Sequence, residues 1–333
     1  MPISYPDRVE LANIPTPLQH LARTSEHLGV EVFIKRDDLT GSGLSGNKVR
    51  KLEFLMAEAR ELSADTVITC GGEQSNHCRA TALAAAKLGM SSLLLLRTKD
   101  PQNPPALTGN ILLDRLVGAE IVWISHEDYR RRGELFIEHA ARLRREGKNP
   151  YVVPEGGSNA RGAWGYVRCM EELTDQLPGD ASTTVVHACG SGGTSAGLLL
   201  GARMLNLNPE QWRLAAINVC DDAAYFETVI NRIIGNFPEA TGEFNQADDH
   251  LEIVDGYVGR GYAKSQPEEL TCLRDLARRE AIVLDPVYSG KAFFGMTQQL
   301  AASPDRFGSR IVFLHTGGIF GLFPAADQLA PLL

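Results

Sequence analysis

Short, nearly continuous apolar runs alternate with amphipathic segments along almost the whole chain, and this alternation limits the possible folds most strongly. The runs are EVFIK (31–35), TVITC (66–70), SSLLLL (91–96), EIVWI (120–124), YVV (151–153), TVVHA (184–188), LAAINV (214–219) and RIVFLH (310–315). Most are β-branched or apolar at nearly every position, as strands buried on both faces are. Strands that alternate with helices predict right-handed βαβ crossovers and a parallel sheet. We therefore expect an open, twisted α/β fold.

The segments between these runs predict helices. From about Lys48 onward, apolar residues recur every three or four positions and form one stripe, which comprises Leu52, Leu55, Met56, Ala59 and Leu62. ATALAAAKLG (80–89) and LLLGARML (198–205) are further helical segments. The most loop-like stretches are DPQNPP (100–105) and EFNQADDH (243–250), and composition alone locates no domain boundary.

Four of the expected strands run directly into glycine-rich turns. TVITC leads into GGEQSN, YVVP into EGGSN, TVVHA into CGSGGTSAG, and IVFLH into TGG. In open α/β sheets, ligands bind outside the carboxyl ends of the strands, and glycines allow the backbone to approach a ligand closely. The four turns therefore predict one ligand site that is assembled from several strand ends.

Composition argues against several classes of partner. The chain has 41 acidic and 33 basic residues and no basic tract, which disfavours nucleic acid and anionic membranes as partners. The N-terminal segment lacks the pattern of a signal peptide, and the apolar runs are far too short to span a bilayer. The six cysteines form no C-x-x-C pair, and no cysteine or histidine pattern has zinc spacing. We expect a cytoplasmic protein with reduced cysteines and no metal.

The stretch GSGLSGNKVR (41–50) partly matches three unrelated motifs, and its context argues against each of them. As G-x-G-x-x-G it lacks a strand directly before Gly41 and an acid at the tip of the next strand, which a dinucleotide site requires. As a P-loop it has Asn47 at the lysine position, and as an S-x-x-K motif Ser45 lacks the partner motifs. What remains is Lys48 at a helix start, where the electropositive surroundings lower its pKa and suit it to bond with an aldehyde.

CGSGGTSAG (189–197) is the expected phosphate site, because its small residues free backbone N–H groups and a helix follows them. The same segment contains a G-x-S-x-G match, and Asp285 and His315 follow it in the order of an α/β-hydrolase. A serine hydrolase using Ser195 is therefore an alternative, although we expect Ser195 in the first helical turn and not on a sharp elbow. A phosphate cradle together with an activated lysine indicates pyridoxal 5′-phosphate as the cofactor.

Several segments together resemble the 1-aminocyclopropane-1-carboxylate deaminase/D-cysteine desulfhydrase family, which is part of the tryptophan-synthase-β-like pyridoxal phosphate enzymes of fold type II. The matching segments are IKRDDLTGSGLSGNKVRKLEFL, GGEQSNHCRATA, PYVVPEGGSNARGAWGY, ACGSGGTSAG, LDPVYSGKAFFGM and FLHTGGIFGLF, from residue 34 to 323. The resemblance implies a large cofactor-binding domain of residues 1–49 and 161–333 and a small α/β domain of residues 50–160. It places the cofactor in the cleft between them and implies a homodimer.

The resemblance also implies roles for individual residues. Lys48, in SGNK, forms the covalent link to the cofactor, and Ser75 holds the substrate carboxylate. Tyr262 and Tyr288 face the substrate. The other residues implied at the cofactor or the substrate are Lys51, Asn76, His77, Gly190, Ser191, Gly192, Gly193, Thr194, Ser289 and Thr316.

Two of these positions separate the reactions of the family. The deaminases carry Glu in DPVYEGK and Leu in HLGG, whereas this chain has Ser289 and Thr316 there, the pattern of the D-cysteine desulfhydrases. Hydroxyls leave the ring nitrogen of the cofactor closer to neutral than a carboxylate does, which favours expulsion of a thiolate over opening of a cyclopropane. The resemblance therefore implies α,β-elimination of D-cysteine to pyruvate, hydrogen sulfide and ammonia, with Lys48 removing the α-proton.

Other activities stay open at this point. They are 1-aminocyclopropane-1-carboxylate deamination, L-cysteate sulfo-lyase activity, β-replacement, and a ligand-binding role without chemistry. Glu73 bears on the L-cysteate sulfo-lyase activity, because its charge would disfavour a sulfonate substrate if the side chain faced the site. The sequence does not decide which way Glu73 points.

Overall fold

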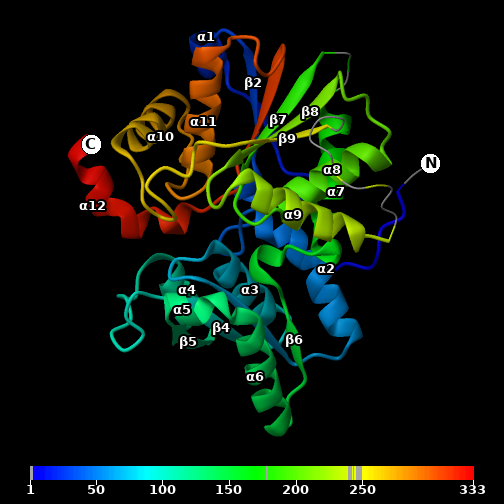
Figure 1. Cartoon of the computed structure of the whole chain (residues 1–333), viewed down its shortest axis with the longest axis vertical. Coiled ribbons are helices and arrows are strands. Elements are labelled where there is room, and N and C mark those ends of the chain that lie inside the picture. The colour runs from blue at the N-terminus through cyan, green and yellow to red at the C-terminus, as the bar shows by residue number, and fades with distance from the viewer. Residues whose placement is uncertain (1–2, 178, 180, 239–241, 243, 245–249) are drawn as a thin grey trace.

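The strands of this chain form two separate sheets. The computed structural model describes residues 3–177, 179, 181–238, 242, 244 and 250–333. The larger sheet has six strands in the order β1–β2–β10–β7–β8–β9, and the smaller has four in the order β5–β4–β3–β6. Figure 1 shows the larger sheet in the upper half of the molecule and the smaller sheet in the lower half, with α2 running between them. The strands are β1 (Leu18–His20), β2 (Glu31–Lys35), β3 (Thr66–Gly72), β4 (Ser91–Arg97), β5 (Glu120–Ile124), β6 (Pro150–Val152), β7 (Thr183–Cys189), β8 (Trp212–Asn218), β9 (Leu251–Val254) and β10 (Arg310–Leu314).

Helices connect the strands and cover both sheets. Those of the described residues are α1 (Ala22–Leu28), α2 (Asn47–Glu61), α3 (Asn76–Lys87), α4 (Gly109–Leu116), α5 (His126–Arg130), α6 (Arg132–Arg145), α7 (Ala160–Gln176), α8 (Gly193–Met204), α9 (Ala223–Gly235), α10 (Pro267–Glu280), α11 (Ser289–Ala302) and α12 (Ala326–Leu329). None of them, in the part of the chain that the structure describes, has the length and hydropathy that a membrane span requires.

Parallel pairing dominates both sheets, which confirms the predicted fold class. The one exception among the described strands is β1, which pairs with β2 in antiparallel orientation. Strands β2 and β5 have the bounds that the sequence predicts. The sequence did not predict β1 and β9, because these strands are short and lack a continuous β-branched run. The segment 243–250 that precedes β9, expected to be a loop, lies almost wholly outside the described residues.

Apolar cores lie on both faces of each sheet. Along β7, Val185 belongs to a core with α7, α8 and α9, whereas its neighbour Val186 packs with α10 and α11. In the smaller sheet, Leu93 of β4 packs in a core with α6, and Leu94 packs in one with α3. Successive side chains of a strand point to opposite faces, so both sheets are covered on two sides, as the apolar runs predict.

The smaller sheet is built from one continuous stretch of the chain. Its four strands lie between residues 66 and 152, and all strands of the larger sheet lie outside that range. The expected boundary at residue 50 falls inside α2, which packs against α7. The division into a large and a small domain at residues 50 and 160 stays a prediction.

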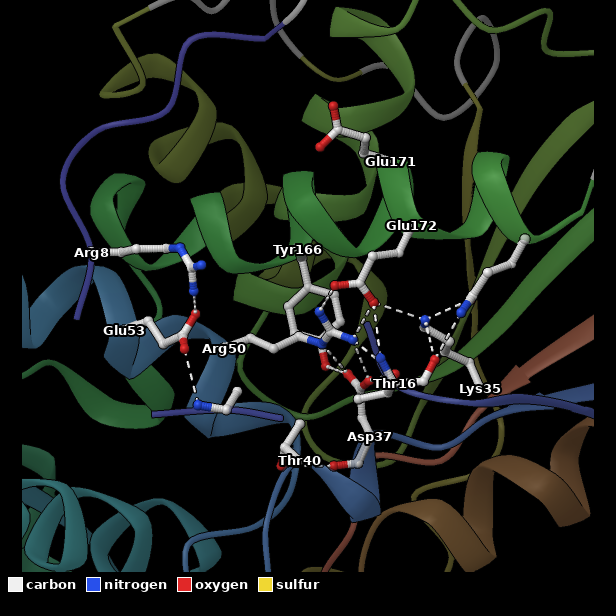
Figure 2. A network of polar contacts seen from close by, with 12 residues as sticks. Arg8, Thr16, Lys35, Asp37, Thr40, Arg50, Glu53, Tyr166, Glu171 and Glu172 are labelled. Carbon is white, nitrogen blue, oxygen red and sulfur yellow. Dashed lines mark hydrogen bonds and ion pairs between the residues drawn. The ribbon is translucent and has the colours of Figure 1, made fainter. Parts of the chain in front are cut away.

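A buried network of charged side chains joins β2, α2 and α7 (Figure 2). Arg50 of α2 donates two hydrogen bonds of 2.8 Å to the carboxylate of Asp37 and two of 2.8 and 2.9 Å to that of Glu172. Lys35 of β2 donates to Glu172 at 2.8 Å, and the hydroxyl of Tyr166 donates to Asp37 at 2.7 Å. The two cations and the two carboxylates therefore compensate one another inside the protein.

This network fixes the helix that carries the predicted cofactor lysine. Arg50 lies between Lys48 and Lys51 on the first turns of α2, so any shift of Arg50 moves both lysines. Breaking a buried ion pair by removing one partner leaves an uncompensated charge, which is costly. The network is thus a rigid support behind the site and takes no part in its lining.

Candidate active site

One cavity of about 960 Å³ lies where strands of both sheets end. Its wall contains residues at or just after the carboxyl ends of six strands, namely Gly71 and Gly72 (β3), Arg97 (β4), Pro154 (β6), Cys189 (β7), Cys220 (β8) and Thr316 (β10). All four glycine-rich turns contribute to it, as the sequence predicts. The cavity is therefore a site between the two sheets.

Most of the predicted site residues face this cavity. Those in its lining are Lys48, Ser75, Asn76, His77, Gly190, Ser191, Gly192, Thr194, Tyr262, Tyr288 and Thr316. Lys51, Gly193 and Ser289 are outside the lining. The roles assigned to all of these residues stay predictions.

Lys48 presents an amine at the cavity wall. It is the second residue of α2, and the glycine loop before this helix is held by Arg79. The Arg79 guanidinium donates to the carbonyl oxygens of Gly43 at 3.0 Å and Ser45 at 2.7 Å. Burial lowers the pKa of Lys48 to about 8. The loop therefore shapes the helix start that carries a lysine with an unusually low pKa.

Lys51 has a buried amine without a carboxylate partner among the described residues. Its Nζ donates one hydrogen bond, of 3.2 Å, to the carbonyl oxygen of Gly156. Burial and the nearby Lys48 hold the pKa of Lys51 well below its usual value. A Cβ built on Gly193 would lie 2.9 Å from this Nζ, so the amine sits directly behind the start of α8. An anion at that place would favour the protonated amine and raise this pKa.

The first turn of α8 supplies the rest of an anion cradle. The helix begins at Gly193, and the N–H groups of a first helical turn lack acceptors within the helix. Gly192 has a φ of 72°, which favours glycine, and the hydroxyl of Ser158 donates to that of Ser191 at 2.9 Å. Backbone donors, hydroxyls and Lys51 thus surround one small space, which suits a phosphate group.

The N-terminus of α3 faces the same cavity from the smaller sheet. Ser75 caps this helix, because its hydroxyl accepts the N–H of Cys78 at 3.1 Å. Asn76 and His77 follow it in the lining. Burial, together with Lys48, keeps the pKa of His77 well below its usual value, so its imidazole is neutral. A carboxylate placed here meets the positive end of a helix.

His77 is held in one orientation by Thr69. The hydroxyl of Thr69 donates to the carbonyl oxygen of Val153 at 2.8 Å and lies 2.7 Å from Nε2 of His77. Because the hydroxyl proton is already used, Nε2 carries the imidazole proton and donates it to Thr69. The other ring nitrogen, Nδ1, is therefore an acceptor.

Tyr262 and Tyr288 form a hydroxyl pair at the cavity wall. The hydroxyl of Tyr288 donates to that of Tyr262 at 3.2 Å, and their ring centroids are 6.0 Å apart. Burial raises the pKa of Tyr262 to about 12 and holds that of Tyr288 well above its usual value. Both tyrosines therefore carry their protons at neutral pH.

Ser289 has little hydrogen-bonding capacity left for a ligand. Its hydroxyl donates to a carboxylate oxygen of Asp285 at 2.5 Å and accepts the backbone N–H of Asp285 at 2.9 Å. One lone pair remains, so toward a ring nitrogen Ser289 can accept but cannot donate. Thr316, in contrast, is part of the lining.

The catalytic triad of the hydrolase alternative is not assembled. The hydroxyl of Ser195 lies 2.8 Å from Nε2 of His187, whereas His315 contacts the carbonyl oxygen of Val283 at 3.1 Å. Asp285 accepts the backbone N–H groups at the start of α11. Ser195 does lie in the first turn of α8, as predicted. The pairing of Ser195 with His315 and Asp285 is wrong, because these residues are committed to other contacts.

Several residues of the lining were not predicted from the sequence. Arg97, Tyr129, Arg132 and Glu155 all face the cavity. Arg97 had a signal in the sequence, since it is a charged residue directly after a buried apolar run. Glu73 is outside the lining, and its carboxylate accepts the hydroxyl proton of Thr98 at 2.5 Å. Glu73 therefore gives no argument against an anionic substrate.

Residues 9–317 match the family described as pyridoxal-phosphate dependent enzyme. The chain belongs to this family. It is 43% identical over 332 residues to the bifunctional D-cysteine desulfhydrase/1-aminocyclopropane-1-carboxylate deaminase, mitochondrial, of Arabidopsis thaliana, with 97% of this chain and 81% of that protein covered. It is 40% identical over 327 residues to the D-cysteine desulfhydrase of Yersinia enterocolitica, with 97% of each covered. A crystal structure of an ACC deaminase homologue superposes with a TM-score of 0.86 at 40% identity, over 98% of this chain and 96% of that one.

The cavity of this pyridoxal-phosphate dependent enzyme fits its cofactor. The cradle at the start of α8 and the uncompensated Lys51 suit the phosphate, and Lys48 offers an amine for the aldehyde. Fold type II, expected from the resemblance, is confirmed. No group of three or more metal-ligating side chains gathers anywhere in the described residues.

The pKa of Lys48 predicts how capture of the cofactor depends on pH. Only the neutral amine attacks an aldehyde, and the lowered pKa makes the neutral form abundant near pH 8. We expect the rate of cofactor binding to cofactor-free protein to rise with pH and level off above about 8. The growth of the visible absorption band after mixing measures this rate. A rate that still climbs through pH 10, where an ordinary lysine titrates, would contradict the lowered pKa.

Proposed function

We propose that this enzyme catalyses the α,β-elimination of D-cysteine to pyruvate, hydrogen sulfide and ammonia. The observation that carries the proposal is the meeting of three features in one cavity. These are the amine of Lys48, an anion cradle at the start of α8, and the Ser75-capped start of α3. The relatives named D-cysteine desulfhydrase, which match the chain over nearly its whole length, support it.

Each of the residues named above has a separate role in this proposed reaction. The bound cofactor supplies an electron sink for the bonds at the substrate's Cα. Ser75 and the start of α3 bind the substrate carboxylate, and the cradle with Lys51 binds the phosphate. Lys48 removes the proton from Cα, for which a pKa of about 8 is suitable near neutral pH. Tyr262 and Tyr288, both protonated, orient the substrate's side chain.

Deamination of 1-aminocyclopropane-1-carboxylate is the second candidate. The relative from Arabidopsis is named for both activities, which supports deamination as a second candidate function. Ser289 and Thr316 favour the elimination, because neither supplies a carboxylate. The hydroxyl of Ser289 is also engaged by Asp285, which limits its influence on the cofactor.

A substrate panel tests the proposal. The purified protein, loaded with cofactor, is given D-cysteine, L-cysteine, β-chloro-D-alanine, L-cysteate and 1-aminocyclopropane-1-carboxylate in parallel. We expect D-cysteine to give pyruvate and sulfide at a higher kcat/KM than the cyclopropane gives 2-oxobutanoate. The reverse order would make the enzyme a deaminase, and turnover of L-cysteate alone would make it a sulfo-lyase.

We also propose a cytoplasmic homodimer. All six cysteines are free, which agrees with a reducing compartment. Exposed apolar side chains lie on α4 and on the short helical turn Ile319–Gly321 that packs against it, among them Leu112, Leu116 and Ile319. Exposed apolar patches of this kind are typical of protein interfaces. Sedimentation equilibrium measures the mass directly, and a monomer would refute the dimer.

A further inference from the structure

Arg97 lines the cavity at the carboxyl end of β4. It is the last residue of β4, opposite Gly72 in the parallel register, and thus stands beside the turn that leads to Ser75. Its guanidinium lies between two aromatic rings, with Cζ 4.6 Å from the ring centre of Tyr129 and 4.7 Å from that of Tyr262. The planar cation is therefore held in position by stacking.

Arg97 has no carboxylate partner among the described residues. The guanidinium makes no hydrogen bond and no ion pair with any of them, although it carries five N–H donors. Arg132 provides the contrast. It stacks on the same Tyr129 ring, at 5.0 Å, but its Nε pairs with the carboxylate of Glu155 at 3.1 Å. Of these two neighbouring cations, Arg97 is the one that is free to bind an anion.

The proposed function gives the phosphate and the substrate carboxylate partners other than Arg97. The phosphate has the cradle at α8 with Lys51, and the substrate carboxylate has Ser75 and the start of α3. Arg97 instead adjoins Tyr262, which pairs with Tyr288. In the proposed function these two tyrosines orient the substrate's side chain. A third negative charge is therefore expected at the side-chain end of the substrate.

We propose that Arg97 binds the leaving group of the elimination and favours substrates whose β-substituent departs as a moderately basic anion. The inference rests on the proposed function. In the reaction the Cα–H bond breaks and its proton passes to Nζ of Lys48. The electron pair forms the Cα=Cβ bond, and the Cβ–S bond breaks with its pair on sulfur, as hydrosulfide. Arg97 stabilises this developing charge without giving up a proton. The hydrosulfide accepts the proton that Lys48 took from Cα, directly or through water, and leaves as hydrogen sulfide. Water then converts the three-carbon product to pyruvate and ammonia.

This role also gives a physical reason for the choice of reaction. Opening a cyclopropane releases no anion, so Arg97 contributes nothing to that step. Expulsion of sulfide, a moderately basic anion, gains from a fixed cation. Expulsion of chloride, a very weak base, needs little such help. The experiment should therefore compare substrates that differ in their leaving group.

The kinetic test compares D-cysteine with β-chloro-D-alanine in two variants. Arg97→Met keeps an unbranched side chain between the rings and removes the charge, and Arg97→Lys keeps the charge and loses the planar fork. We expect Arg97→Met to lower kcat for D-cysteine by about 10²–10³-fold, as loss of one stabilising donor does elsewhere. The loss for β-chloro-D-alanine should be below about tenfold, and Arg97→Lys should fall between. Arg132→Met is the matched control, since it removes a cation from the same ring, and it should affect both substrates alike.

The binding test uses D-aspartate and D-asparagine, which have nearly the same size, differ in side-chain charge, and carry no leaving group. Calorimetry on the cofactor-loaded protein should show tighter binding of D-aspartate to the wild type and no preference in Arg97→Met. An equal loss for both reactive substrates, through KM, would mean that Arg97 binds the α-carboxylate and would overturn the proposal. If the wild type releases pyruvate from neither substrate, the proposed function fails. The aspartate preference then still shows whether Arg97 takes an anion at the side-chain end.

Discussion

Replacing Lys48 with alanine is expected to abolish the release of pyruvate from D-cysteine and to remove the visible absorption band of the bound cofactor. Lys48 lines the same cavity as the anion cradle and the start of α3, and burial lowers its pKa to about 8. Its loss removes both the covalent link to the cofactor and the base at Cα. A general base alone contributes about 10²–10⁴-fold to a rate, so we expect a decrease in kcat above about 10³-fold.

Borohydride reduction identifies the linked lysine independently of activity. Reduction of the wild-type protein, digestion and mass spectrometry should place the cofactor on Lys48. Lys87→Ala, at the exposed end of α3, is the control and should keep both the band and the activity. A band that persists in Lys48→Ala, or a label on Lys51, would show that another amine holds the cofactor.

Replacing Glu172 with glutamine is expected to lower the free energy of unfolding by about 3–5 kcal/mol, because Arg50 and Lys35 then lose a shared buried counter-charge. Denaturant titration measures the difference. Glu171→Gln is the matched control, since Glu171 is the preceding residue of α7 and points away from the network in Figure 2. Its carboxylate accepts the hydroxyl proton of Tyr5 at 2.8 Å, and we expect a loss near 1 kcal/mol.

The same network predicts how stability depends on pH. The cations beside them hold the pKa values of Asp37 and Glu172 below their usual range in the folded protein, against the effect of burial. The stabilisation from these groups is therefore complete above their unfolded pKa values of about 4 and is lost as pH falls through the lower, folded values. The wild type should lose stability on acidification below about pH 4, and Glu172→Gln should lose less. Equal slopes for the two proteins would show that Glu172 is not paired.

Local patterns in the sequence located most elements and missed a few for identifiable reasons. EVFIK and EIVWI became β2 and β5 with the same bounds, because a β-branched apolar run between turn residues has few alternatives. β1 is a three-residue antiparallel edge strand of sequence LQH, which has no such run. Its pairing depends on β2 lying beside it, and local periodicity carries no such information.

The sequence predicted the hydrogen-bond partners of polar side chains less well than it predicted the helices and strands. Ser195 was placed in the correct helical turn but paired with the wrong histidine, since His187 reaches it from β7. The role of Ser289 at the cofactor stays a prediction, but no pattern in the sequence indicated that Asp285 engages its hydroxyl. Hydrogen-bond partners depend on side-chain directions after folding, which a motif does not specify.

By itself, the sequence determined the fold class, the glycine-rich strand ends as the place of the site, and Lys48 as the lysine at a helix start. These follow from local features: burial of apolar runs, backbone freedom of glycine and the field at a helix terminus. The tertiary structure alone decided that the ends of two separate sheets face one cavity, that Arg50 is compensated, and that Lys51 and Arg97 are not. Whether a charge is compensated depends on residues far apart in the sequence, because only folding brings them within a few ångströms of one another.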